Sequence, residues 1–169
     1  MNDLIWYLDS YVVPAAFALL PGKMASREAR AMLLTTALQE SGDLKYRRQM
    51  IGKPMKPLGP ARGFWQFELA GGVVEVLTSI QTKSIIVPIA DMLCIDPTAP
   101  ACHEAITYND ILAACFARLL LYRDPRILPS PVEAEKGWSI YVDNWRPGKP
   151  HPEGWSARFD RAWQVVKGV

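Results

Sequence analysis

Hydrophobic residues recur along most of this chain at the three- and four-residue spacing that one face of an α-helix requires. The strongest instance predicts a helix from Tyr108 to Tyr122, which Asn109 or Thr107 can cap. Asp124-Pro125 ends this helix, because proline disfavours helical geometry in the residue before it. The predicted buried stripe consists of Ile111, Leu112, Cys115, Phe116, Leu119 and Leu120.

The amino-terminal quarter of the chain predicts two further helices. The first runs from about Leu4 to Leu20 and is broken near Pro14, because a proline removes a backbone hydrogen bond and crowds the preceding turn. The second runs from about Arg27 to Ser41. Ser26 is its expected N-cap, and Gly42 is expected to end it.

Beyond residue 42 the pattern alternates between loops and short helices. From Asp43 to Pro60 the chain is basic, rich in proline and glycine and without periodicity, so a long exposed loop is expected. Helices are predicted over 73–80, 85–93, 130–142 and 156–167, with loop over 144–154. The 85–93 segment is β-branched, but helix is favoured because no partner strand with matching alternation occurs elsewhere. The sequence therefore predicts one mainly α-helical domain over 1–169.

Composition narrows the function classes. Half of the 169 residues are hydrophobic and 21% are charged, which is typical of a globular domain with a sizeable core. The net charge of +2 gives no indication of a nucleic-acid partner. Cys94 and Cys102 flank a proline-containing turn where they could pair if oxidised, or they are buried thiols, whereas Cys115 is expected in the core. No cofactor or metal is expected, because the cysteines match no zinc spacing and His103 and His151 lack metal-compatible neighbours.

The apolar stretch from Tyr11 to Leu20 is not expected to target or anchor the protein. A signal peptide begins with basic residues, whereas Asp3 and Asp9 precede this stretch. Pro21 and Lys23 follow too closely to leave the roughly 20 apolar residues that a membrane-spanning helix needs. We therefore expect a buried first helix, without a signal peptide or a transmembrane segment.

Glu40 is the carboxylate whose position points most clearly to chemistry. The residues four, seven, eight and eleven positions before it share its helical face, and they are Thr36, Leu33, Met32 and Ala29. A carboxyl group held against apolar surface has a raised pKa, which a general acid needs near neutral pH. The alternative is a helix-end glutamate that reaches water or pairs with Arg47 or Arg48.

Three blocks in order carry a family resemblance. Glu40-Ser41, a loop, and then Ala-Arg-Gly-Phe-Trp-Gln at 61–66 resemble the soluble lytic transglycosylase and goose-type lysozyme superfamily. Its pattern is a helix ending in Glu-Ser, a loop, and Ala-x-Gly-Leu-Met-Gln, so Phe64 and Trp65 replace Leu and Met. Asn-Trp-Arg-Pro-Gly at 144–148 resembles the family's Tyr-Asn-Ala-Gly-Pro-Gly, with Asp143 in place of the tyrosine that orients the catalytic glutamate. Tyr141 or Tyr108 are the candidates to replace it.

The resemblance implies a lysozyme-like fold that cleaves the MurNAc–GlcNAc bond of peptidoglycan, with Glu40 as general acid and base. In lytic transglycosylases one glutamate performs both proton transfers, so no second carboxylate is obligatory. For an ordinary hydrolase, Glu68 or Asp43 would be the first partner to test, although the favoured role for Glu68 is that of a carboxylate at a helix N-terminus. The implied substrate-binding residues are Ser41, Gly63, Trp65, Gln66, Tyr141, Asn144 and Trp145. The alternatives are a local helix-end bond for Ser41 and core packing for the tryptophans, including the further stacking candidates Trp138 and Trp155.

The implied partners are peptidoglycan glycan strands. The sequence segment from Arg62 to Glu68 also resembles small proteins encoded among the virion genes of tailed bacteriophages. A phage protein that acts on the periplasmic wall from a virion or a host cell is therefore expected, with other virion or tail proteins as further partners. The basic stretch from Lys45 to Lys56 is either a solvated loop or a contact for stem-peptide carboxylates. The alternative function is an inactive virion structural protein on a lysozyme-like scaffold, which Asp143 and the bulky Phe64-Trp65 pair favour.

Overall fold

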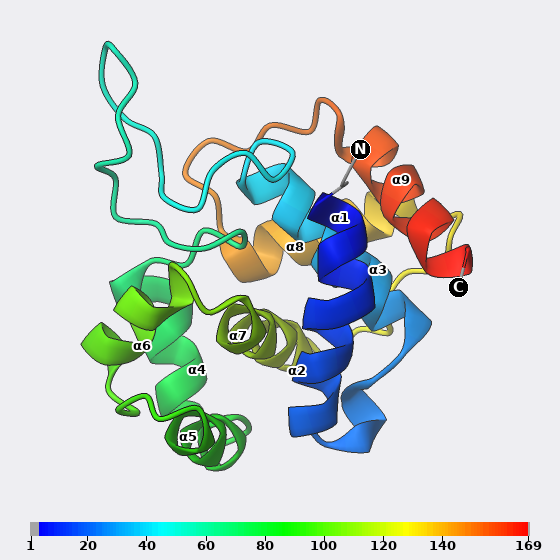
Figure 1. The fold of residues 1–169 in the computed structure, drawn as a ribbon. Coiled ribbons are helices and arrows are strands. Elements are labelled where there is room, and N and C mark those ends of the chain that lie inside the picture. Colours follow the sequence, from blue (N-terminus) through cyan, green and yellow to red (C-terminus); the bar gives the residue numbers. More distant parts are fainter. Residues whose placement is uncertain (1–3, 169) are drawn as a thin grey trace.

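Helix α7 (Asp110–Tyr122) runs through the middle of the fold, and the other helices pack around it (Figure 1). The computed structural model describes residues 4–168, so Asp3 lies outside the described part. It is 60% helical and, within those residues, contains no strand. The prediction of a mainly α-helical fold is confirmed.

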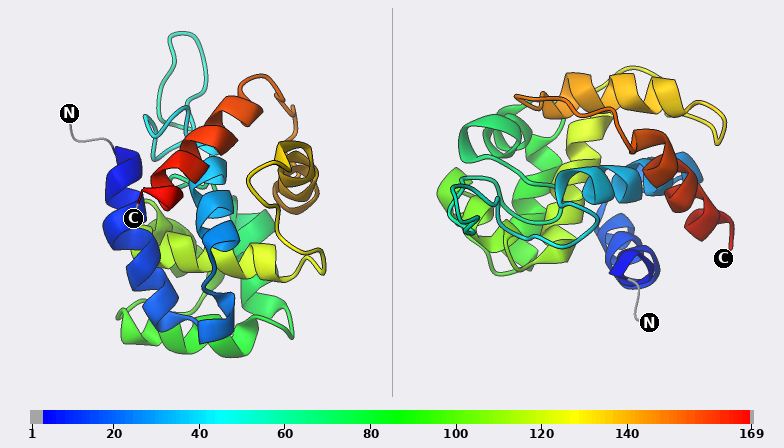
Figure 2. Two further views of the ribbon diagram at one scale, coloured as in Figure 1. Left: turned by 90° about the vertical axis from the view of Figure 1, so that its right-hand side faces the viewer. Right: turned by 90° about the horizontal axis from the view of Figure 1, so that it is seen from above.

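The remaining helical elements follow one another in chain order. The amino-terminal group comprises α1 (Leu4–Tyr7), the π-helix η1 (Leu8–Val12), α2 (Val13–Leu19), the 3-10 helix η2 (Gly22–Met24) and α3 (Arg27–Glu40). The second group comprises the π-helix η3 (Leu69–Val73), α4 (Val74–Thr78), α5 (Lys83–Met92) and α6 (Ala99–Ile106). After α7 come α8 (Ala134–Trp145) and α9 (Trp155–Lys167), and α9 packs along α3 (Figure 2).

Helix α7 is buried on every side rather than along one stripe. All of its residues from Leu112 to Leu121 are buried, because α2, α3, α4, α5, α6 and α8 contact it from different directions. Ile111 is the one residue of the predicted stripe that stays partly exposed. Asn109 is the cap, and its Oδ1 accepts a hydrogen bond from the Leu112 amide at 3.0 Å.

The two predicted amino-terminal helices are present. Ser26 caps α3 as expected, with its Oγ accepting from the Ala29 amide at 3.1 Å. The predicted break near Pro14 takes the form of the π-helical segment η1 directly before α2. Because η1 continues into α2 without leaving helical geometry, Pro14 lies inside one helical stretch over Leu4–Leu19, and the π-helical turn before it accommodates the backbone hydrogen bond that proline cannot form.

Two predictions near prolines are wrong: one helix was missed, and the bounds of another differ. Helix α6 was not predicted, because the cluster Pro97-Thr98-Ala99-Pro100 was interpreted as a turn only, whereas Pro100 begins a helix. Helix α8 starts at Ala134 and continues to Trp145, so Asn144 and Trp145 belong to its last turn rather than to a loop. The left-handed Arg146, with φ 48°, ends it.

The long loop from Asp43 to Pro60 projects from the helical body as an arm, as Figures 1 and 2 show. Its residues Ile51 to Leu58 are all exposed, as predicted. A pair of backbone hydrogen bonds between Ile51 and Lys56 closes the tip. At the base, Arg47 turns inward, pairs with the buried Asp110 and lies 4.1 Å from the centroid of the Phe64 ring.

The cysteines do not form disulfides among the described residues, and the pairing considered for Cys94 and Cys102 is absent. Cys94 is exposed, whereas Cys102 is buried with its Sγ 3.6 Å from the carbonyl oxygen of Asp96. Cys115 is in the core, as predicted. Within residues 4–168, no individual helix is both long enough and apolar enough to cross a bilayer. Two sharply bent pairs of helices have the required length and apolar character when each pair is taken together.

Candidate active site

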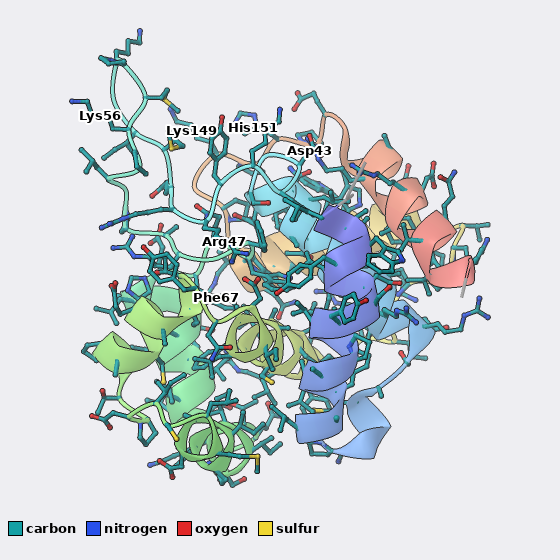
Figure 3. All side chains as sticks on the ribbon, in the orientation of Figure 1. Asp43, Arg47, Lys56, Phe67, Lys149 and His151 are labelled. Atoms are coloured by element: carbon teal, nitrogen blue, oxygen red, sulfur yellow. The ribbon has the colours of Figure 1, made fainter. Side chains whose placement is uncertain are left out.

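A cleft of about 830 Å³ opens at the carboxyl end of α3. Most of its walls come from Glu40 at the end of α3, the 61–72 segment, α4, and the stretch 144–149 at the end of α8, and Gln49 and Leu120 complete them. Figure 3 labels two of its lining residues, Phe67 and Lys149. The cleft therefore brings together the three sequence blocks that carried the family resemblance.

Glu40 is largely buried in the wall of this cleft, and its pKa is raised from 4.5 to about 7. Burial is the main cause, because it penalises the charged form, and the negative charge of Glu68 adds to it. The hydrogen bond from Tyr141 acts in the opposite direction. The suggested pairing with Arg47 does not occur, since Arg47 binds Asp110. At neutral pH a substantial fraction of Glu40 is therefore protonated.

Tyr141 fixes the orientation of the Glu40 carboxyl group. Its hydroxyl donates a hydrogen bond of 2.5 Å to Oε1 of Glu40. The Tyr141 ring is buried and stacks on Trp155 with centroids 5.0 Å apart, so its position is held by packing. Of the two tyrosines considered for this role, Tyr108 is 78% exposed and lies outside the cleft.

Asp143 does not take part in the site, although it occupies the sequence position of the family's tyrosine. Its carboxylate is exposed and forms an ion pair of 2.9 Å with Arg126. On the helix α8, Tyr141 lies two residues earlier and therefore faces a different direction, toward α3. Tyr141, and not Asp143, therefore contacts Glu40.

Three of the predicted substrate-binding residues do not line the cleft, namely Ser41, Gly63 and Trp65. Ser41 is fully buried, donates to the carbonyl of Ala37 at 2.6 Å and accepts from the Leu44 amide at 3.0 Å, which is the helix-end alternative. Trp65 is fully buried and donates from Nε1 to the carbonyl oxygen of Leu33 at 2.9 Å. It has no exposed face on which a sugar ring could stack.

Gly63 is required by the fold rather than by a ligand. Its φ is +71°, and a Cβ there would lie 2.8 Å from the carbonyl oxygen of Ile106. That distance is too short for a real side chain, so only glycine lets the 61–68 turn approach α6 so closely. The sequence pattern correctly marked a position that needs glycine, but the group that approaches Gly63 is the backbone of Ile106.

Gln66, Asn144 and Trp145 do line the cleft. Gln66 has a positive φ of 47°, which is uncommon for a residue with a side chain, and its Nε2 donates to the carbonyl oxygen of Gly63 at 2.7 Å. Asn144 donates to a carboxylate oxygen of Asp124, and Trp145 donates to the carbonyl oxygen of Trp65 at 3.0 Å. These bonds hold the three side chains in place along the cleft wall.

The candidate second carboxylates differ in their surroundings. Glu68 lines the cleft and its charge reaches Glu40. Asp43 lies outside the cleft and is bound by Arg158, with Nε 2.8 Å from Oδ1, and that bond lowers its pKa. Glu68 is therefore the carboxylate placed to influence Glu40. Trp138 and Trp155, the further stacking candidates, pack against Tyr141 instead of lining the cleft.

Sequence reasoning missed an ion pair at the cleft. Arg146, from the end of α8, binds Glu75 of α4, and both residues line the cleft. Glu75 also binds Arg123. No local pattern could have indicated this pair, because its members lie far apart in the sequence and meet only when α8 packs near α4.

The raised pKa of Glu40 predicts a pH-dependent stability cost. A carboxyl group whose folded-state pKa exceeds its unfolded value stabilises the fold at acid pH and loses that contribution as pH rises, here between about 4.5 and about 7. The Glu40→Gln variant, which keeps an acceptor for Tyr141, should therefore match the wild type near pH 4. Above pH 7 it should be more stable by up to about 3 kcal/mol, measured by urea unfolding across pH.

The matched control is Asp43→Asn, since Arg158 lowers the pKa of Asp43. Its effect has the opposite sign: the substitution should cost stability at neutral pH and lose that effect as pH falls. A Glu40→Gln variant with no stability gain at high pH would show that Glu40 is not desolvated as described.

These observations define what the arrangement can do chemically. A partly protonated carboxyl group, held by a fixed hydroxyl in the wall of an open cleft, can transfer a proton to a bound ligand. Within residues 4–168, no group of three or more histidine, cysteine or acidic side chains is arranged to hold a metal ion. Comparison with protein-family models, with curated proteins and with solved structures finds no match to this chain.

Proposed function

We propose that this protein cleaves the MurNAc–GlcNAc bond of peptidoglycan, as a lytic transglycosylase or a lysozyme, with Glu40 as the general acid and base. The observation that carries the proposal is the Glu40 carboxyl group itself. It lies in the wall of a cleft, its pKa is about 7, and Tyr141 fixes its orientation. A general acid is most effective when its pKa lies near the working pH.

In the proposed mechanism each oxygen of the carboxyl group has a separate task. Tyr141 donates to Oε1, so Oε1 is the acceptor and Oε2 carries the acidic proton. The neutral Glu40 passes this proton to the glycosidic oxygen as the bond to the leaving sugar breaks. The resulting carboxylate then removes a proton from the incoming hydroxyl, which closes a 1,6-anhydro ring if it is the C6 hydroxyl of the same sugar. If the incoming group is water, the outcome is hydrolysis.

Glu68 contributes by its charge in this scheme. Its carboxylate raises the pKa of Glu40 and so increases the protonated fraction at neutral pH. It also lines the cleft, where a negative charge favours the positive charge that develops on the sugar in the transition state. Gln66 and Trp145 are the proposed contacts for the glycan, since both line the cleft near the two acids.

The proposal includes the biological setting that the sequence resemblance implied: a phage protein acting on the periplasmic wall from a virion or a host cell. The alternative is an inactive virion protein on the same scaffold. One argument for that alternative was the bulky Phe64-Trp65 pair. Both side chains are buried, and neither lines the cleft. The pair therefore leaves the cleft open.

The test is a digest of purified murein, with the soluble fragments analysed by mass spectrometry. We expect fragments ending in 1,6-anhydro-MurNAc for a transglycosylase, and fragments with reducing ends for a hydrolase. A boiled sample of the same protein is the control for spontaneous release. No fragments from the folded protein, together with its copurification with phage particles, would replace the proposal by the inactive alternative.

A further inference from the structure

Arg118 is a buried cation in the middle of α7. Its side chain is only 6% exposed. Nε donates a hydrogen bond of 2.8 Å to the carbonyl oxygen of Met24, whereas Nη1 is buried and has no hydrogen-bond partner. Buried polar groups in proteins are paired in the great majority of cases, and an unpaired buried charge costs several kcal/mol. This guanidinium is therefore an exception that needs an explanation.

No acidic side chain neutralises Arg118 among the described residues. Asp124 lines the same cavity as Arg118, but its carboxylate is bound by Arg126 and by Asn144. Another cation lies close by: Lys23 is over the Tyr122 ring at 5.3 Å, and the Arg118 guanidinium lies 5.6 Å from the same ring. Burial accordingly lowers the pKa of Arg118 to about 10, and only Tyr122 acts against it. The positive charge is uncompensated.

Arg118 also lines a cavity of about 470 Å³ that is separate from the Glu40 cleft. The two cavities have no lining residue in common. Leu121, Pro125 and Leu128 supply its apolar residues, while Asp124 and Arg126 form an ion pair at its side that Arg126 shares with Asp143. The cavity thus combines a guanidinium that has no acidic partner with a lining that is part polar and part apolar, which suits a small amphiphilic ligand.

We propose that this cavity binds a small carboxylate with a short apolar body, whose oxygens pair with the guanidinium of Arg118. Nε is occupied by the carbonyl oxygen of Met24 and Nη1 is enclosed, so a carboxylate oxygen accepts its charge-assisted hydrogen bond from the remaining nitrogen, Nη2, and compensates the charge. A monoanion fits better than a doubly charged phosphate, because one positive charge is uncompensated and Asp124 lines the same cavity. The source is either a free small acid or the carboxyl terminus of a polypeptide.

The test is a thermal unfolding titration of the full chain in a buffer free of carboxylates. Isobutyrate represents the free acid and N-acetyl-leucine represents a polypeptide terminus. Each binder is expected to raise the Tm in a saturable way, by about 3–5 °C at ten times its dissociation constant. Isobutyramide, which has the same shape without the charge, should have no effect, and phosphate should bind more weakly than the carboxylates.

The matched variant is Arg118→Met, which keeps a long side chain without the charge. It should show no response to either carboxylate, and it should be at least as stable as the wild type without ligand, because an unpaired buried charge is removed. Should that variant fail to fold, the Nε–Hε signal of Arg118 in the wild type provides the second readout, and it should shift on addition of isobutyrate. Equal responses in wild type and variant, or an unshifted signal at saturating isobutyrate, would overturn the proposal.

The murein digest separates this inference from the proposed function. Arg118 lies outside the Glu40 cleft, so Arg118→Met should release the same fragments as the wild type. Loss of carboxylate binding with unchanged digestion would support a site of its own.

Discussion

Replacing Glu40 by glutamine is expected to lower the turnover of murein by about 10²–10⁴-fold while leaving the fold intact. The amide cannot donate a proton to the glycosidic oxygen, which removes general acid and base together. Glutamine has nearly the same shape, and its oxygen still accepts the hydrogen bond from Tyr141. The measurement is the rate of fragment release, with circular dichroism of both proteins to confirm equal folding.

The control for this prediction is Glu68→Gln, in the same cleft. Removal of the Glu68 charge lowers the pKa of Glu40. The pH above which the activity of the Glu68→Gln variant declines, the alkaline limb of its pH–rate profile, should therefore move to lower pH, with a modest change in the maximum rate. If Glu68→Gln abolished activity as completely as Glu40→Gln, two carboxylates would be obligatory and the single-acid scheme would be wrong. More than a tenth of the activity remaining in Glu40→Gln would exclude Glu40 as the acid.

Replacing Tyr141 by phenylalanine is expected to move the alkaline limb of the pH profile to higher pH. In the wild type the proton-donating form of Glu40 disappears above its pKa of about 7. The Tyr141 hydrogen bond stabilises the carboxylate and holds that pKa down, so its loss raises the pKa further. The same change should lower the maximum rate about ten- to a hundredfold, because a hydrogen bond to a charged group contributes about 1.5–3 kcal/mol.

Phenylalanine keeps the ring that stacks on Trp155, so the packing of α8 should survive this substitution. Tyr108→Phe is the matched control, since its side chain is 78% exposed and lies outside the cleft. It should leave both the rate and the pH profile unchanged. An alkaline limb that stays in place in Tyr141→Phe would mean that the limb reports another group.

The distinction between the two variants matters for the assignment of roles. Glu40→Gln removes the proton that reacts, so it should lower the rate at every pH. Tyr141→Phe leaves that proton and changes its pKa and direction, so it should alter the shape of the pH profile. A variant that merely weakened the fold would reduce the rate without shifting the limb.

The sequence predicted the helical elements where a local signal was strong. The capping Ser26 and the periodic stripe of α7 were identified from residue type and spacing, whereas the β-branched segment of α5 was predicted to be helical because no matching partner strand occurs. Errors arose at prolines, where one residue type serves both turns and first helical turns, as at Pro100. Local patterns specify where a helix can begin, but packing decides whether it does.

The candidate site residues were likewise predicted correctly only in part. Glu40 on an apolar face followed from helical periodicity, and Gln66, Asn144 and Trp145 followed from the resemblance and do line the cleft. Ser41 and Gly63 matched the same pattern, and Trp65 replaced its methionine, but all three are buried by their neighbours. Residue identity and spacing cannot distinguish a side chain that faces a cleft from one that faces the core.

For this protein, then, the sequence by itself determined a mainly α-helical chain and a glutamate on an apolar helical face, because both depend on residues within a few turns of one another. Only the tertiary structure decided that Tyr141, 101 residues away, orients that glutamate, and that burial raises its pKa to about 7. It alone also left Arg118 without a counter-charge. Desolvation and hydrogen bonds between distant residues arise when helices pack, and no local pattern encodes them.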